Sequence, residues 1–351
     1  MSRKPWAAPI LTSVEAPTSL VDEQGKVIFG HFDGPVTTLG QKDFHYKTCM
    51  DSDASKWAKH FHYKQFQFVS IVTPHYIIGV ALADIRYLGS AFCYLYDIKR
   101  GKLLESNWLK PLGLGYQTSA SPFNGVAAIS GRKGHFKMEI VDGVWHLTLQ
   151  SLAIDAELSL QPAALSLPMA MCSPTGYNGW TYTQKHNGLK VLGRLFINDE
   201  PQPLQRVCAG YDFSAGYMRS ETSWRWASIN ALTSTGSIGL NLAAGVNETG
   251  TTENVFWHDG ERHLLGPVRF QFTRQPGGQS SGIWRVFSDN GQVNLRFSSV
   301  DSRFEKLNLW LLKSNFRQYI GYFDGYVIDN FGQKHEIINT LGLTEDHFAK
   351  W

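Results

Sequence analysis

Residues 208–260 read CAGYDFSAGYMRSETSWRWASINALTSTGSIGLNLAAGVNETGTTENVFWHDG and combine polar and aromatic side chains more densely than any other strand-like stretch. Trp224 and Trp226 lie two residues apart, so both side chains point to one face of an extended strand. Further on, apolar residues alternate with small residues and amides, which are Gly239, Asn241, Ala243, Gly245 and Asn247. Because Asn and Gly are poor choices for an ordinary exposed strand, this face predicts a pocket wall. The alternative is a solvated sheet face that covers buried tryptophans.

The composition favours a β protein without a nucleic-acid partner. Of the 351 residues, 13% are aromatic, 18% are charged and 33 are glycine. Such a chain suits many short strands that are joined by glycine turns and filled by large side chains. The formal net charge is only +3, from 33 basic and 30 acidic residues, and no basic block occurs. We therefore expect no binding to nucleic acid.

Period-two alternation of apolar residues recurs along most of the chain and predicts antiparallel strands. Three dipeptides between alternating runs predict hairpin turns: Asp142-Gly143, Asp259-Gly260 and Asn290-Gly291. A helix is expected at residues 54–59, and a short terminal helix is expected to open at Thr344 as its N-cap. Residues 161–180 lose the alternation and carry three prolines, which indicates a connection between domains. We expect one β domain at residues 1–165 and a second at residues 175–351.

Several classes of site and location are disfavoured. The four cysteines lack a C-x-x-C pair, which indicates reduced, buried thiols in a cytoplasmic protein: Cys49, Cys93, Cys172 and Cys208. The longest apolar runs, such as residues 76–83, are too short to span a bilayer, and no secretory signal is expected. None of the 12 histidines has the spacing of a zinc site, and no Gly-x-Ser-x-Gly or phosphate-binding glycine motif occurs. No metal and no cofactor are expected.

Carboxylates in aromatic surroundings are the strongest candidates for chemistry. Those in or beside aromatic strands are Asp84, Asp212, Glu221, Glu248 and Glu253. Aromatic neighbours would desolvate a carboxyl and raise its pKa, so that it donates a proton near neutral pH, and their faces can stabilise a carbocation. This combination predicts protonation of an alkene, followed by water capture or ring closure. The alternatives are that Asp212 caps a turn and that Glu221 pairs with Arg225 on the sheet surface.

An ordered series of motifs resembles the bacterial family catalogued as domain of unknown function 2804. In chain order the series is Tyr182-Thr-x-Lys185, Asp212-Phe-Ser-x-Gly216, Arg219-x-Glu221-Thr222-x-Trp224-x-Trp226-Ala227-Ser228, Gly239-Leu240-Asn241-Leu242, Thr252-Glu253-Asn254, Gln318-x-x-Gly321-x-Phe323-x-Gly325 and Glu345-x-His347. The resemblance covers nearly the whole chain. Lys185 belongs to a dense polar group at residues 182–188, most of which a strand that ends in an Asn-Gly turn would explain.

A more distant resemblance points to a chemistry. Asp212-x-x-x-Gly216 followed by Trp224-x-Trp226 is similar to the Asp-His-x-Trp-Gly and Trp-Asp-Trp elements of hydroxyneurosporene synthases, which are carotenoid hydratases. Three positions depart from that pattern: Phe213, Ala215 and Arg225. The resemblance to these hydratases, to tocopherol cyclases and to certain fungal pericyclases implies paired lipocalin-like domains, with Asp212 at the position of the acid.

The expected fold is all-β, with two lipocalin-like (calycin-type) antiparallel β-barrels or curved sheets packed together. The expected ligand is a hydrophobic, lipid-like or isoprenoid small molecule in a barrel or interdomain cavity, with acid-assisted hydration, isomerisation or cyclisation of a C=C bond. A non-catalytic lipid carrier or sensor and a carbohydrate-binding module are the alternatives. The candidate catalytic residues are Asp212, Glu221 and Glu253, with Asp212 leading. The candidate ligand-binding residues are Lys185, Trp224, Trp226, Asn241 and Asn254. The oligomeric state stays open.

Overall fold

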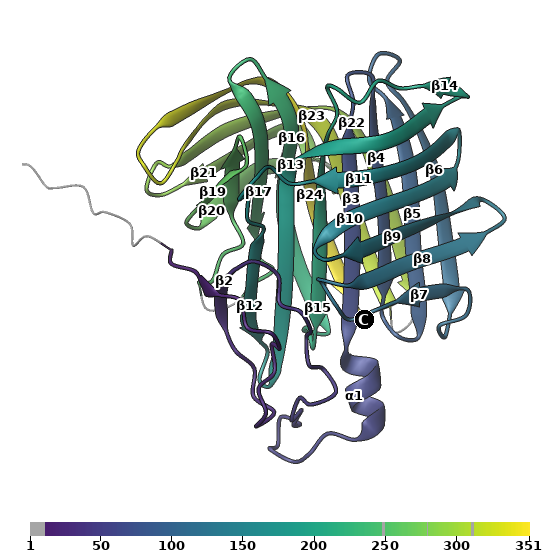
Figure 1. Cartoon of the computed structure of the whole chain (residues 1–351), viewed down its shortest axis with the longest axis vertical. Helices are drawn as coiled ribbons and strands as arrows, with labels where there is room; N and C mark the ends of the chain where they lie inside the picture. Colours follow the sequence, from purple (N-terminus) through teal and green to yellow (C-terminus); the bar gives the residue numbers. More distant parts are fainter. Residues whose placement is uncertain (1–10, 248–249, 279, 310–311) are drawn as a thin grey trace, which may run out of the picture.

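The computed structural model describes residues 11–247, 250–278, 280–309 and 312–351. These residues form two sheets, one of 15 strands and one of nine, and the strands pair almost throughout in antiparallel fashion. The predicted all-β fold of two curved sheets is confirmed (Figure 1). The candidate carboxylate Glu248 lies outside the described residues.

The first sheet curls into a nearly closed barrel. Its strands are β1 (Val14–Glu15), β2 (Gly30–Asp33), β3 (Lys64–Val72), β4 (Tyr76–Asp84), β5 (Leu88–Asp97), β6 (Lys102–Pro111), β7 (Tyr116–Thr118), β8 (Gly125–Gly131), β9 (Gly134–Val141), β10 (Val144–Ser151), β11 (Ile154–Gln161), β12 (Met169–Thr175), β13 (Gly179–Ile197), β14 (Glu200–Pro201) and β15 (Cys208–Gly216). The order along its main path is β6-β5-β4-β3-β15-β13-β11-β10-β9-β8-β7. The sheet has two arms, β3–β6 at one end of this order and β7–β11 at the other, and the two arms face each other. Trp108 of β6 packs edge-on against Phe136 of β9. Large apolar side chains fill the space between the arms, so it is a core.

The second sheet forms a half-barrel. Its strands are β16 (Glu221–Thr233), β17 (Gly236–Ala244), β18 (Val255–His258), β19 (Glu261–Leu264), β20 (Val268–Arg274), β21 (Ser280–Ser288), β22 (Val293–Leu309), β23 (Leu312–Ile328) and β24 (Lys334–Lys350). Their order is β19-β18-β17-β16-β24-β23-β22-β21-β20. A separate apolar core lies on the side that this sheet encloses.

The three predicted hairpin turns are confirmed. Asp142 and Gly143 join β9 to β10 with φ angles of 48° and 80°. Asp259 and Gly260 join β18 to β19 with φ angles of 48° and 84°. Positive φ at both central residues matches the twist of antiparallel strands, which is why the Asp-Gly dipeptide predicts this turn. The segment that contains Asn290-Gly291 connects β21 to β22.

The predicted terminal helix is wrong, because Thr344 lies inside β24 and is completely buried. Strand β24 pairs with β16 on one edge and with β23 on the other, and this pairing overrides the local preference for a helix N-terminus. The other expected helix is present as α1 (Lys56–His62), and the Ser55 hydroxyl accepts a hydrogen bond from the Ala58 amide. Cys49 is exposed, contrary to expectation, whereas the other three cysteines are buried.

The change from the first sheet to the second falls between Gly216 and Glu221, later in the chain than the expected connection at residues 161–180. The alternation disappears there because β12 and the first half of β13 are buried on both faces. A strand that is buried on both faces lacks the alternation of buried and solvent-facing residues that marks a half-buried strand in the sequence. No helix in the described part of the chain is long and apolar enough to cross a membrane.

The two sheets meet along β3–β5, β13 and β15 of the first sheet and β16, β17, β23 and β24 of the second. An apolar cluster crosses this junction, in which Phe68 packs edge-on against Trp226 with ring centroids 6.0 Å apart. Buried amides fasten the junction, since Asn187 Nδ2 donates to Ser228 Oγ at 2.7 Å. Strand β17 approaches so closely that a Cβ at Gly239 would lie 2.5 Å from the Asn187 carbonyl. The interface between the sheets is therefore held at a fixed spacing.

Candidate active site between the two sheets

A cavity of about 230 Å³ lies in the interface between the sheets. Strands β3, β4, β5, β13 and β15 of the first sheet line it together with β16, β22, β23 and β24 of the second. Aromatic side chains make up much of its wall: Phe66, Phe68, Phe92, Trp224, Trp226, Phe316 and Trp351. An aromatic, partly enclosed space between two β units is a typical ligand site.

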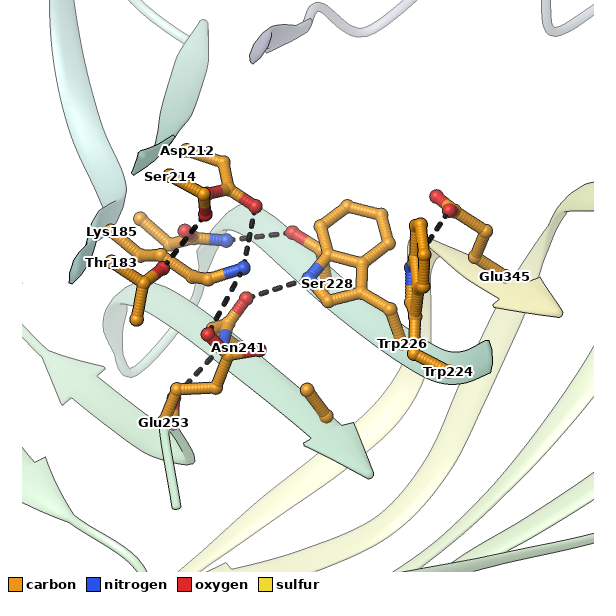
Figure 2. A network of polar contacts seen from close by, with 12 residues as sticks. Thr183, Lys185, Asp212, Ser214, Trp224, Trp226, Ser228, Asn241, Glu253 and Glu345 are labelled. Atoms are coloured by element: carbon orange, nitrogen blue, oxygen red, sulfur yellow. Dashed lines mark hydrogen bonds and ion pairs between the residues drawn. The ribbon is translucent and has the colours of Figure 1, made fainter. Parts of the chain in front are cut away.

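A lysine and two carboxylates form the polar end of this cavity (Figure 2). Lys185 on β13 and Asp212 on β15 are direct partners across neighbouring antiparallel strands, and Lys185 Nζ lies 2.5 Å from Asp212 Oδ2. Glu253, which precedes β18, reaches the same ammonium, with its Oε2 3.6 Å from Lys185 Nζ. We call these three residues the acid cluster.

Hydroxyl groups complete the acid cluster. Ser214 Oγ donates to Asp212 Oδ1 at 3.2 Å. Thr183 Oγ1 lies 3.0 Å from Ser214 Oγ, and the Thr183 side chain also forms a hydrogen bond with the Glu253 carboxyl. Thr183 lies two residues before Lys185 on β13, and Ser214 lies two residues after Asp212 on β15. Residues two apart share one face of a strand, so all four side chains lie on the face that turns toward the cavity. The cluster is thereby held in one geometry before any ligand binds.

The buried position of Glu253 favours a proton on its carboxyl. Burial raises the pKa of Glu253, the nearby Lys185 opposes this and Asp212 adds to it, with a net rise. Burial lowers the pKa of Lys185, but the carboxylates of Asp212 and Glu253 outweigh burial and raise it. The lysine therefore stays positive and pairs with the closer aspartate. The Glu253 side chain is only 3% exposed, and as the second carboxyl for one ammonium it is the group best placed to hold a proton.

An asparagine links the acid cluster to the aromatic wall. Asn241 Oδ1 accepts from Trp226 Nε1 at 2.7 Å, and Asn241 Nδ2 donates to the Glu253 carbonyl at 2.9 Å. The buried amide thus satisfies both of its polar groups and sets the position of the indole relative to the carboxyl. Figure 2 shows Asn241 between Glu253 and Trp226.

A second polar group lies beyond the tryptophans. Trp224 Nε1 donates to Glu345 Oε1 at 3.1 Å, and the His347 ring lies against the indole with centroids 4.2 Å apart. His347 Nε2 is 2.9 Å from Ser314 Oγ. Gln318 also lines the cavity, and its buried Oε1 has no hydrogen-bond partner among the described residues. A ligand that fills the aromatic space would therefore meet polar groups at both ends.

The structure brings most of the expected site residues together. Lys185, Asp212, Trp224, Trp226 and Glu253 all line the cavity, and Asn241 supports two of them from behind.

Two expected site residues lie elsewhere. Asn254 is buried and ties down backbone, since its Oδ1 accepts from the Ala243 amide and its Nδ2 donates to the Gly266 carbonyl. Glu221 has a side chain that is 54% exposed and pairs with Lys350 at 2.9 Å, outside the cavity. Arg225, the alternative partner of Glu221, contacts Asp346 instead.

Sequence reasoning missed Glu345 and His347 as site residues. Both belong to a motif of the family series, and a spacing of two would have placed them on one strand face had the segment not been interpreted as a helix. The phenylalanines of β3 and β5 were missed for a different reason. Their alternation predicts a buried face, but nothing local tells which partner covers that face.

Fold and site together define a class: an all-β protein of two lipocalin-like curled sheets with an aromatic cavity and a buried acid cluster between them. The chain belongs to the family described as "Domain of unknown function (DUF2804)", whose model matches residues 12–351. The family resemblance of the motif series is thus confirmed. No curated protein matches the chain.

Three solved structures are similar to this chain at low sequence identity. The structure of CghA is 8% identical, with a TM-score of 0.52 over 96% of this chain and 97% of that one. Kievitone hydratase from Nectria haematococca is 13% identical, with a TM-score of 0.49 over 82% and 88% of the two chains. A putative AttH from Nitrosomonas europaea is 14% identical, with a TM-score of 0.48 over 81% and 92%. The likeness to CghA over nearly the full length of both chains shows a shared fold.

Proposed function

We propose that this protein binds a hydrophobic, lipid-like or isoprenoid molecule between its two sheets and protonates a C=C bond of that molecule with Glu253. The observation that carries the proposal is the junction of an aromatic cavity with a buried cluster of two carboxyls and one lysine. Aromatic walls suit an apolar ligand, and a carboxyl with a raised pKa suits a general acid.

In the proposed reaction, the Glu253 carboxyl donates its proton to one carbon of the double bond, and the other carbon becomes cationic. The faces of Trp226 and Trp224 stabilise this cation through their negative quadrupoles. Water, or a second group of the ligand, then attacks the cation, giving hydration or cyclisation, and loss of a proton from a neighbouring carbon gives isomerisation. The proton released from the attacking water or from that carbon returns to the Glu253 carboxylate, which restores the acid. Burial and the Asp212 carboxylate favour the protonated form of Glu253 before transfer, and the Lys185 ammonium compensates the Glu253 anion afterwards.

The raised pKa of Glu253 sets the pH dependence. A general acid works only while it is protonated, so the rate should fall as the pH rises through the pKa of Glu253. A carrier or sensor that does no chemistry would retain its ligand unchanged under the same conditions. A sugar-binding module would retain carbohydrates and no lipid.

The ligand class can be tested by filling the cavity. Ala83 lines the cavity on β4, and Ala83→Leu would occupy part of the apolar space. We expect wild-type protein, incubated with a bacterial cell extract and repurified, to retain an isoprenoid or other lipid that mass spectrometry identifies. Ala83→Leu should retain at least about tenfold less lipid, since the larger leucine side chain occupies space that the ligand needs.

Ala128→Leu is the matched control, because Ala128 is a half-buried alanine on β8 that does not line the cavity. It should retain as much lipid as the wild type. Equal loss in both variants, or retention of sugars in place of lipids by the wild type, would contradict the proposal.

A further inference from the structure

A second hollow, of about 350 Å³, lies on the opposite face of the strands that line the cavity. Side chains of a strand alternate between its faces, so the chain neighbours of cavity residues point to this other side. Trp224, Gln318 and Glu345 line the cavity, whereas Arg225, Arg317 and Asp346 line the hollow. The hollow lies on the side of the second sheet that encloses its own core, because Arg225 shares its strand face with the core residue Ala227.

Three arginines converge on a single carboxylate in this hollow. Arg274 of β20 contacts Asp346 through two nitrogens, with the closest N–O distance 2.6 Å. Arg225 Nε lies 3.1 Å and Arg317 Nη1 lies 3.3 Å from the same carboxylate. The Asp346 side chain is only 4% exposed. The buried Asp346 carboxylate thus holds the three guanidinium groups close to one another.

Asp346 does not neutralise the cluster. With the histidine neutral, the side chains that line the hollow carry three positive charges and one negative, a net charge of +2. Each guanidinium has five N–H donors, and Arg225 and Arg317 each direct only one nitrogen to Asp346. The Arg225 and Arg274 side chains are 30% and 46% exposed, so donors remain within reach of a solute.

An unpaired acceptor lies beside these donors. Asn315 is two residues from Arg317 on the same strand face and lines the hollow, and its buried Oδ1 has no partner among the described residues. Arginine forks match the oxygens of phosphate and carboxylate groups. A monohydrogen phosphate group also carries an O–H that can donate to Asn315, which a carboxylate lacks. The combination of donors and one acceptor therefore favours phosphate.

We propose that this arginine hollow is a second binding site, specific for a phosphate group, either of a soluble phosphate compound or of a lipid headgroup. It is separate from the acid cluster, because the sheet formed by β16, β23 and β24 lies between them. Nothing in the proposal requires chemistry at the cavity.

The test uses inorganic phosphate and the full-length chain at constant ionic strength. Calorimetric titration should show saturable binding, and Arg274→Gln should weaken it about tenfold, as expected for the loss of a charged hydrogen-bonding partner. Arg269→Gln is the matched control on the same strand, because Arg269 pairs with Asp289 and both side chains are 67% exposed.

A parallel arm distinguishes the two sources of phosphate. Phosphatidylcholine vesicles with and without phosphatidic acid are sedimented with wild type, Arg274→Gln and Arg269→Gln. Binding to phosphatidic acid without binding to inorganic phosphate assigns the site to a lipid headgroup, and the reverse assigns it to a soluble phosphate. The proposal is overturned if neither probe binds saturably, or if Arg274→Gln binds as well as Arg269→Gln.

Discussion

Replacing Glu253 with glutamine should abolish conversion of the bound ligand and leave its binding nearly intact. Glutamine keeps the shape and the hydrogen-bonding capacity of the side chain but has no acidic proton. Loss of a general acid typically costs about 10²–10⁴-fold in rate. Mass spectrometry of the ligand retained by Glu253→Gln should therefore reveal unconverted substrate, whereas the wild type releases or retains product.

Two further variants make this result specific. Glu221→Gln removes a carboxyl of the same type outside the cavity, where Glu221 pairs with Lys350, and should convert ligand at the wild-type rate. Asp212→Asn distinguishes the acid from its neighbour. It should lower the rate less than Glu253→Gln, because we assign Asp212 to the pairing of Lys185. Full activity of Glu253→Gln together with an inactive Asp212→Asn would move the acid to Asp212 and refute our assignment.

Replacing Lys185 with methionine should destabilise the folded protein strongly at neutral pH. The ammonium is the shared partner of Asp212 and Glu253, and its removal leaves the largely buried Asp212 carboxylate without a counterion and the buried Glu253 carboxyl without a nearby positive charge. Breaking a buried ion pair from one side costs about 3–5 kcal/mol in the free energy of unfolding. Lys350→Met is the control, since the exposed pair of Lys350 with Glu221 should contribute about 0–1 kcal/mol.

The pH dependence of this defect has a definite sign. Burial already raises the pKa of Glu253 above its unfolded value, so its contribution to stability is present at low pH and is lost as the pH rises through the folded-state pKa. The Lys185 ammonium lowers the pKa of Glu253, so its removal raises this pKa further. The range of pH over which Glu253 loses its contribution to the free energy of unfolding then extends to higher pH. Urea denaturation at about pH 4, near the ordinary pKa of a glutamate, and at about pH 8, well above it, should show the larger deficit at high pH. A deficit that is equal at both pH values would contradict the shared-counterion account.

Local sequence patterns predicted the parts of the fold that depend on neighbours in the chain. The spacing of Trp224 and Trp226 and the Asp-Gly turns fix strand faces and hairpins without information from elsewhere. The pairing of Lys185 with Asp212 depends on the register of β13 against β15. Only the family resemblance, and no local pattern, linked those two residues before the structure did.

The prediction of a terminal helix was wrong because strand partners from distant parts of the chain outweighed a local pattern. The segment that begins at Thr344 carries a good helix N-cap and acidic residues behind it, but strand partners on both edges hold it extended in β24. The expectation that Asp212 is the leading acid came from its motif and stays a prediction, for which we propose Glu253 as the alternative. The short distance from Asp212 to Lys185, and the deeper burial of Glu253, emerge only when three separate segments are brought together.

Deuterium incorporation tests the central claim, protonation of a C=C bond by Glu253, most directly. The unconverted ligand retained by Glu253→Gln is purified and incubated in D2O with fresh wild type, Glu253→Gln or Glu221→Gln, and the product is analysed by mass spectrometry. We predict a product with one carbon-bound deuterium that does not wash out in H2O, formed by wild type and Glu221→Gln and absent with Glu253→Gln. A product without carbon-bound deuterium, or equal incorporation by Glu253→Gln, would contradict the account.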